Sequence, residues 1–118
     1  WEAAMCAAHY KLNNLTAFVD FNGLQIDGNI EEVMNPSPID KKFEAFGWNA
    51  LVIDGHNYDD IIDAIEKARN CKDMPTVIVC KTIKGKGVSF MENDAGWHGV
   101  APSKEQCEKA LAEIGGNR

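Results

Sequence analysis

The stretch that decides the fold is Leu15-Thr-Ala-Phe-Val19, which runs into Asp20-Phe-Asn-Gly-Leu-Gln-Ile-Asp-Gly28. The first segment is apolar enough for a short buried strand, and the second is a polar turn with two glycines. In open α/β sheets, ligands bind outside the carboxyl ends of the strands. The Asn22 amide oxygen and the backbone carbonyls beside it are hard oxygen ligands that suit Mg²⁺ or Ca²⁺. The residues therefore predict either a cation site or an Asn-Gly turn without a ligand, and both interpretations stand at this point.

Strands and helices alternate along the chain. We expect helices at about residues 2–12, 40–46, 58–70 and 104–114, and strands at about 15–20, 50–53 and 76–80. Asn57 and Ser103 are the expected N-caps of the last two helices. Such alternation with short connections predicts an α/β fold, a parallel sheet with helices on both faces, within one domain that spans residues 1–118.

Composition excludes some classes of function. The 118 residues carry a net charge of −6 with scattered lysines, which argues against a nucleic-acid partner. No apolar run approaches the roughly 18–20 residues that cross a membrane. The cysteines show no CxxC spacing, and Cys6 and Cys80 lie in apolar stretches, the usual setting of a buried reduced thiol. We therefore expect neither a disulfide framework nor a zinc site, and a cytoplasmic location.

Two further loops are expected at the same sheet edge as the Asn22 loop, at residues 54–57 and 81–102. The Lys84-Gly-Lys-Gly87 run is either a phosphate cradle or a flexible solvated loop, and the second interpretation is favoured. His98, between a tryptophan and a glycine, is a candidate for phosphate contact or proton transfer; the alternative is a loop histidine bonded to a backbone carbonyl. His56 is adequately explained by turn formation before Asn57.

A series of recognisable segments covers most of the chain. They are Trp1–Leu12, Ala17-Phe-Val-Asp-Phe-Asn-Gly-Leu-Gln-Ile-Asp-Gly28, Phe43-Glu-Ala-Phe-Gly-Trp48, Ile53-Asp-Gly-His56, Cys80-Lys-Thr-Ile-Lys-Gly-Lys-Gly-Val-Ser-Phe90 and Trp97-His-Gly-Val-Ala-Pro102. In content, order and spacing these segments resemble transketolase. The Lys-Gly-Lys-Gly-Val-Ser-Phe-Met-Glu-Asn stretch is most similar to the amino-terminal subunit of two-gene transketolases. The resemblance covers the carboxyl-terminal half of that subunit's Rossmann-like thiamine-diphosphate-binding domain.

The resemblance implies thiamine diphosphate with Mg²⁺ or Ca²⁺, and transfer of a two-carbon ketol unit between sugar phosphates. It implies that Asn22 binds the metal through its side chain and Leu24 through its backbone carbonyl. His98 matches a histidine that contacts both the cofactor's diphosphate side and the sugar, and therefore counts as a cofactor-binding and catalytic candidate. Glu2 matches a glutamate near the dimer interface. Lys84 stands where other transketolases often carry an apolar residue.

The resemblance also implies that parts of the enzyme lie outside this sequence. The family's metal site begins with Gly-Asp-Gly, which belongs before Trp1, and the glutamate that activates the cofactor's aminopyrimidine belongs to another domain. We expect a fragment of a longer protein that binds no cofactor alone and whose partners are the missing segments or subunit. The alternative is a non-catalytic α/β module for binding or oligomerisation. A short parallel sheet with open edges predicts a homo-oligomer that buries the flank of residues 15–19 or the helix at residues 1–12.

Overall fold

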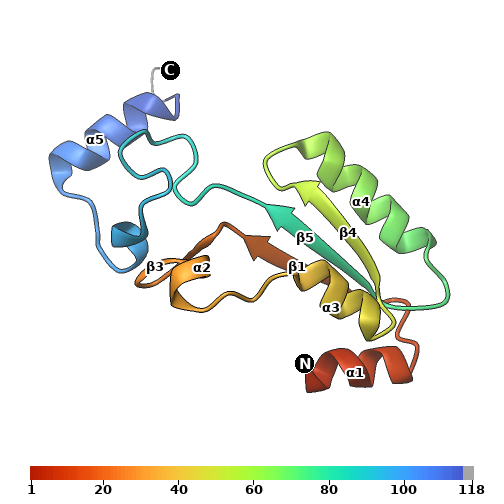
Figure 1. Cartoon of the computed structure of the whole chain (residues 1–118). Helices are drawn as coiled ribbons and strands as arrows, with labels where there is room; N and C mark the ends of the chain where they lie inside the picture. Colours follow the sequence, from red (N-terminus) through yellow and green to blue (C-terminus); the bar gives the residue numbers. More distant parts are fainter. Residues whose placement is uncertain (116–118) are drawn as a thin grey trace. The chain divides into compact units, whose positions relative to one another are not determined.

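The computed structural model describes residues 1–115, and they fall into two compact units. Unit 1 comprises Trp1–Phe21 and Pro36–Thr82, and unit 2 comprises Asn22–Asn35 and the chain from Ile83 onward. The chain therefore passes from unit 1 to unit 2 where each of two strands ends, at Phe21 and just after Lys81 (Figure 1).

Unit 1 is built on a three-stranded parallel sheet with the strand order β1-β5-β4. Its strands are β1 (Thr16–Phe21), β4 (Asn49–Asp54) and β5 (Thr76–Lys81). The apolar β5 lies in the centre, and Val77 and Ile78 are completely buried. The predicted parallel sheet is confirmed. Because β5 is covered on both faces, its residues form a nearly continuous apolar run.

Helices cover both faces of this sheet (Figure 1). On one face, α1 (Glu2–His9) and α3 (Ile39–Ala45) contribute to a core around Trp48, Val77 and Val79. The Trp48 indole is 5% exposed, and its Nε1 donates to the carbonyl of Ala4 at 2.8 Å. A buried indole N–H needs such an acceptor, so this bond fixes α1 against the sheet.

The other face is covered by α4 (Tyr58–Asn70). The helix begins at the predicted cap: Asn57 Oδ1 accepts from the backbone N–H of Asp59 at 2.9 Å. Ala64 and Ala68 are its buried residues, and their small side chains let the helix approach the sheet closely.

Two local predictions differ from the structure. The first helix ends at His9 rather than near residue 12, because Lys11 has a positive φ of 51° that no helix accommodates. Cys6 is exposed and not buried, because α1 turns only its alanine face toward the sheet. Cys80, on β5, is partly buried.

Unit 2 has little regular structure. A hairpin of β2 (Leu24–Gln25) and β3 (Gly28–Asn29) leads into the short α2 (Ile30–Val33), and a 3₁₀ turn, η1 (Ala95–His98), precedes α5 (Lys104–Glu113). The predicted cap of α5 is confirmed as a capping box: Ser103 Oγ accepts from Gln106 N at 3.3 Å, and Gln106 Oε1 accepts from Ser103 N at 2.7 Å. Within residues 1–115, no helix is long and apolar enough to cross a membrane.

Candidate functional site

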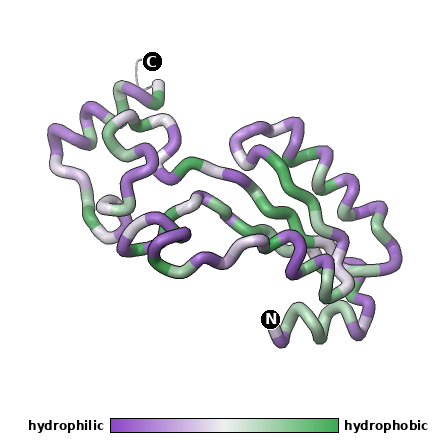
Figure 2. Tube along the Cα trace, in the orientation of Figure 1, coloured by the Kyte–Doolittle hydropathy of each residue, from purple (hydrophilic) through white to green (hydrophobic). Residues whose placement is uncertain are grey.

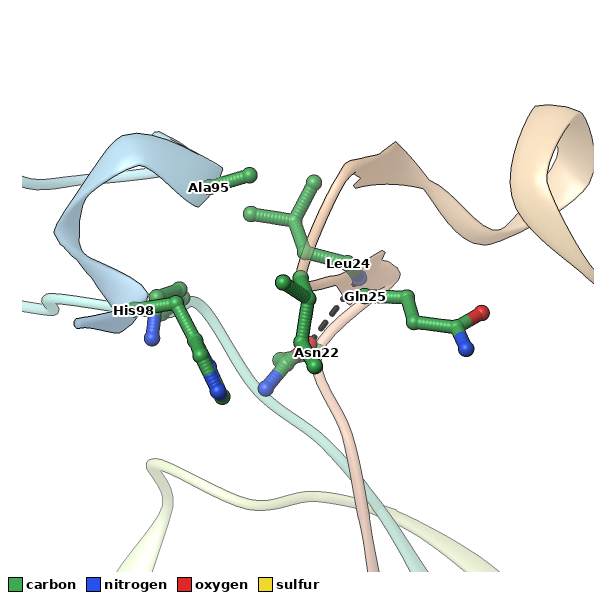
Figure 3. Close-up of a pocket in the computed structure, with 7 residues that line it drawn as sticks. Asn22, Leu24, Gln25, Ala95 and His98 are labelled. Carbon is green, nitrogen blue, oxygen red and sulfur yellow. Dashed lines mark hydrogen bonds between the residues drawn. The ribbon is translucent and has the colours of Figure 1, made fainter.

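A pocket of about 270 Å³ lies within unit 2. Residues from the Asn22 loop and from the long loop after β5 line it together: Asn22, Leu24, Gln25, Ile26, Lys84, Ala95 and His98. Asn22, Leu24 and His98, which the resemblance implied as residues of one site, line the same pocket (Figure 3). They stand 76 positions apart at the extremes, from 22 to 98, so the fold and not the local sequence brings them together.

Asn22 is held in a tight turn directly after β1. Its Oδ1 accepts from the backbone N–H of Leu24 at 2.9 Å (Figure 3). Gly23 sits between them with φ 75°, a conformation that favours glycine, and its carbonyl accepts from Ile30 N at 3.1 Å. The segment does form a hairpin, as the interpretation without a ligand predicted, but Ile26 and the following residue make its turn and Asn22 precedes it.

His98 closes the 3₁₀ turn η1 on the other side of the pocket, and in Figure 3 its ring and the Asn22 side chain approach the same space. Asp94 Oδ1 caps the turn by accepting from Gly96 N at 2.8 Å. Trp97 anchors it, because its Nε1 donates to the Phe90 carbonyl at 3.0 Å. Among the described residues no hydrogen bond joins the His98 ring to a backbone carbonyl, and His98 lines the pocket.

The Lys84-Gly-Lys-Gly87 run is a folded turn rather than a flexible loop. Gly85 has φ 72°, and a Cβ there would lie 2.5 Å from the carbonyl oxygen of Met91. Gly87 N donates to Glu92 Oε1 at 2.9 Å, and Lys86 Nζ lies 3.7 Å from the same oxygen. Lys86 N also donates to the Ile83 carbonyl, at 3.2 Å, so the amides of Lys86 and Gly87 are bonded within the loop. Of the run, Lys84 lines the pocket, at the position where the resemblance implies an apolar residue in other transketolases.

The lining chemistry fits part of a metal–diphosphate group. The Lys84 ammonium and the His98 imidazole are donors suited to phosphate oxygens. Asn22 Oδ1 keeps a second lone pair beside the one used by Leu24 N, so it remains a competent oxygen ligand. No carboxylate lines this pocket, and residues 1–115 contain no group of three His, Cys, Asp or Glu side chains placed to hold a metal. The pocket is also slightly below the usual size of about 300–1,000 Å³ for a complete ligand site.

An ordered contact that the sequence did not reveal ties α5 to the loop before it. The carboxylate of Glu113 accepts from the backbone N–H of Ser89 and, at 2.8 Å, from the Ser89 hydroxyl. The bond from the backbone N–H and then that from the hydroxyl lower the pKa of Glu113 below its usual value of 4.5. The pairing joins residues 24 positions apart, so no local pattern signals it.

The remaining candidates lie in unit 1. Glu2 opens α1, and its side chain is almost fully exposed, where an acidic residue at a helix N-terminus is favourable. Its predicted place at a dimer interface stays a prediction. The backbone N–H of His56 donates to Asp54 Oδ1 at 2.8 Å, in agreement with its predicted role in a turn.

Comparison with known proteins gives the family. The family model described as "Transketolase, thiamine diphosphate binding domain" matches residues 1–117. The 6-deoxy-6-sulfo-D-fructose transketolase subunit SqwG of Clostridium sp. (strain MSTE9) is 43% identical over 114 residues, which are 97% of this chain and 42% of that protein. An apulose-4-phosphate transketolase subunit of Phocaeicola vulgatus is 42% identical over 114 residues, or 97% of this chain and 41% of that protein. The chain thus spans less than half the length of these relatives.

Solved structures agree with the sequence comparison. The transketolase of Campylobacter jejuni superposes with a TM-score of 0.89 at 32% identity, over 97% of this chain and 18% of that one. A Pichia stipitis transketolase in complex with sedoheptulose 7-phosphate gives a TM-score of 0.88 at 28% identity, over 97% and 17%. The sequence motifs, the parallel sheet and the match to the family model all indicate the same family. This chain belongs to the transketolase family, within its thiamine diphosphate binding domain.

Proposed function

We propose that this chain supplies one wall of the thiamine diphosphate site of a two-gene transketolase. The observation that carries the proposal is the shared pocket of Asn22, Leu24, Lys84 and His98, in a chain that the thiamine-diphosphate-binding family matches along nearly its whole length. The relatives named as transketolase subunits support an enzyme divided between polypeptides. The reaction proposed for the complete assembly is transfer of a two-carbon ketol unit between sugar phosphates.

Four of the lining residues have a role in this proposal. Asn22 Oδ1 and the Leu24 carbonyl are oxygen ligands for a divalent cation, Mg²⁺ or Ca²⁺. Lys84 and His98 donate to the diphosphate, and a His98 ring nitrogen also donates to, or accepts a proton from, a hydroxyl of the bound sugar. The bound cofactor supplies the carbanion chemistry, while the protein orients the reactants and stabilises charge.

The same residues indicate that the metal site is incomplete within this chain. Mg²⁺ takes about six oxygen ligands in near-octahedral geometry. The oxygen ligands that the pocket offers, from Asn22 and Leu24, are both neutral. A diphosphate then has no anionic protein partner that holds its metal. We infer that residues 1–118 alone bind no cofactor and have no activity, and that the missing segments and a partner subunit complete the enzyme. Four free cysteines, at positions 6, 71, 80 and 107, favour the reducing cytoplasm as its compartment.

A second candidate function is a non-catalytic oligomerisation or binding module. The neutral metal ligands favour it for the isolated chain, as do the open sheet edges of unit 1. A homo-oligomer is the form expected in that case. The two candidates differ in what restores cofactor binding, because only the first predicts that a complementary transketolase polypeptide does so.

Calorimetric titration with thiamine diphosphate and Mg²⁺ tests the proposal. The expected result is no detectable heat for the chain alone and micromolar binding after co-expression with the rest of a two-gene transketolase. In that assembly, His98→Ala and Lys84→Ala should each weaken binding at least about tenfold, as the loss of a charge-assisted hydrogen bond predicts. His9→Ala on α1 is the matched control and should leave it unchanged. Micromolar binding by the chain alone, or no effect of His98→Ala, would contradict the proposal.

A further inference from the structure

Helix α5 is attached to the loop before it by a few side-chain contacts. None of its residues, Lys104–Glu113, is buried, and Figure 2 shows a largely hydrophilic helix, so no apolar face holds it in place. The Glu113 carboxylate accepts from the Ser89 backbone N–H and, at 2.8 Å, from the Ser89 hydroxyl. One turn earlier, the Lys109 ammonium lies 5.1 Å from the centre of the Phe90 ring, within cation–π range. Helix α5 therefore holds Ser89 and Phe90, at the tip of the loop.

The loop tip that α5 contacts in turn holds Trp97. The Trp97 Nε1 donates to the Phe90 carbonyl at 3.0 Å, and the two aromatic rings meet edge to face with their centres 5.5 Å apart. Trp97 is the third residue of η1 and directly precedes His98. His98 is exposed, so the position of its ring depends chiefly on the backbone that Trp97 anchors. A series of contacts thus runs from Glu113 to the residue beside His98.

The loop between these contacts is closed on itself. At its base, the Lys84 carbonyl accepts from Asn93 N at 3.0 Å. Nearer its tip, the Val88 carbonyl accepts from Met91 N at 2.9 Å and from Glu92 N at 3.1 Å. Val88, directly before Ser89, is 8% exposed. Because these internal bonds keep the loop folded, a contact made at its tip also restrains its base, where the chain continues into η1.

We propose that Glu113 is a positioning residue for His98. Its contact with Ser89 holds the loop, and the loop holds Trp97 and with it the His98 imidazole at the pocket. The inference rests on the proposed function for what His98 binds, the diphosphate of thiamine diphosphate. It extends the residues that matter for this site to a helix outside the pocket lining. Because Glu113 acts through His98, its loss cannot weaken cofactor binding more than the loss of His98 does.

Exchange of the indole N–H groups tests the contact without any cofactor. In the chain alone, Glu113→Ala should speed exchange of the Trp97 indole N–H at least about tenfold, measured by NMR at neutral pH. The indole N–H of Trp48, buried in unit 1, is the internal control and should not change. Glu108→Ala on the same helix is the matched variant and should leave both rates unchanged. Glu113→Gln keeps an amide oxygen that can accept from Ser89, so its rate should lie between those of the wild type and Glu113→Ala.

Cofactor affinity tests the link to His98. In the complemented assembly, calorimetry should show that Glu113→Ala weakens thiamine diphosphate binding about three- to tenfold, less than His98→Ala does, while Glu108→Ala has no effect. In a His98→Ala background, Glu113→Ala should have little further effect, because the residue that Glu113 positions is absent. A merely structural role of Glu113 would instead add the same loss of affinity in both backgrounds.

The two measurements separate this inference from the proposed function. The inference is overturned if Glu113→Ala leaves the exchange rate of the Trp97 indole unchanged. It is also overturned if the substitution leaves cofactor affinity unchanged, or weakens it equally with and without His98. An assembly in which the unaltered chain binds no thiamine diphosphate contradicts the proposed function instead, and the exchange rates then still decide whether Glu113 holds Trp97.

Discussion

The Oδ1 atom of Asn22 accepts a hydrogen bond from the backbone N–H of Leu24 at 2.9 Å. One bond therefore orients both of the residues proposed as metal ligands, since it fixes the Asn22 amide and the start of β2 together. Asn29 makes the same kind of bond outside the pocket, where its Oδ1 accepts from Glu31 N at 2.9 Å and caps α2. Comparing Asn22 with Asn29 therefore separates the structural role of such an asparagine from its proposed ligand-binding role.

Asn22→Ala and Asn29→Ala should have similar effects on stability and different effects on cofactor binding. Each loses one side-chain acceptor for a backbone N–H, which costs about 0.5–1.5 kcal/mol of the free energy of unfolding, measured by urea denaturation. In the complemented assembly, only Asn22→Ala should weaken Mg²⁺-dependent binding of thiamine diphosphate, measured by calorimetry. Equal loss of binding in the two variants would reduce Asn22 to a turn residue.

Gly85→Ala should destabilise the loop that carries Lys84. The substitution strains a φ of 72° and places a Cβ 2.5 Å from the backbone oxygen of Met91. Because that distance is too short for a Cβ contact, the backbone of the loop must move apart. We expect a loss of about 1–3 kcal/mol, measured by chemical denaturation. Gly99→Ala is the matched control, because it has no positive φ and nothing lies within 4 Å of its Cβ position. A Gly85→Ala protein as stable as the control would contradict the described turn.

The contact between Glu113 of α5 and Ser89 should weaken at acid pH. Ser89 lowers the pKa of Glu113 below 4.5 in the folded protein, so the carboxylate contributes stability that is fully present above that value. The contribution is lost as the pH falls through the lower, folded-state pKa. Amide exchange in α5 should therefore accelerate relative to α4 between neutral pH and about pH 3 after correction for intrinsic rates. Glu113→Gln should show the faster exchange already at pH 7, and Glu108→Gln on the same helix should not.

The cysteines should differ in their rates of alkylation. Burial, and secondarily the charge of Asp20, raises the pKa of Cys80 above its usual value of 9.0, which lowers its thiolate fraction. Cys6 and Cys107 are exposed. Iodoacetamide at pH 7.5, followed by mass spectrometry of peptides, should label these two before Cys80. The rates should converge in urea; a Cys80 that reacts first in the native protein would be inconsistent with its burial.

The sequence predicted the sheet of unit 1 well, because local signals coincide there. The apolar run at residues 76–80 and the cap at Asn57 each point to the element that the structure contains. It did not predict the strand order, which depends on contacts between segments distant in sequence, such as Phe18 with Ile78 and Leu51 with Ile78. The exposure of Cys6 was also missed, since an alanine-rich helix does not reveal which face it buries.

The site was only partly predictable. Asn22 and His98 stood out through the glycines and the tryptophan beside them, and both line the pocket. The short hairpin and α2 escaped because segments of two to four residues carry no periodicity. The close approach of Gly85 to Met91 in the loop that carries Lys84 was not predicted either, because no sequence pattern encodes that contact.

The central position of β5 has a consequence for synthesis on the ribosome. β1 and β4 pair with β5 and not with each other, although both precede it in the chain. A nascent polypeptide that has emerged only as far as α4 contains β1 and β4, which form no hydrogen bonds to each other. The sheet can form only when β5 (Thr76–Lys81) leaves the exit tunnel. Until then the apolar strands β1 and β4 stay exposed to chaperones and to aggregation, so unit 1 acquires its cooperative structure only after β5 has been synthesised.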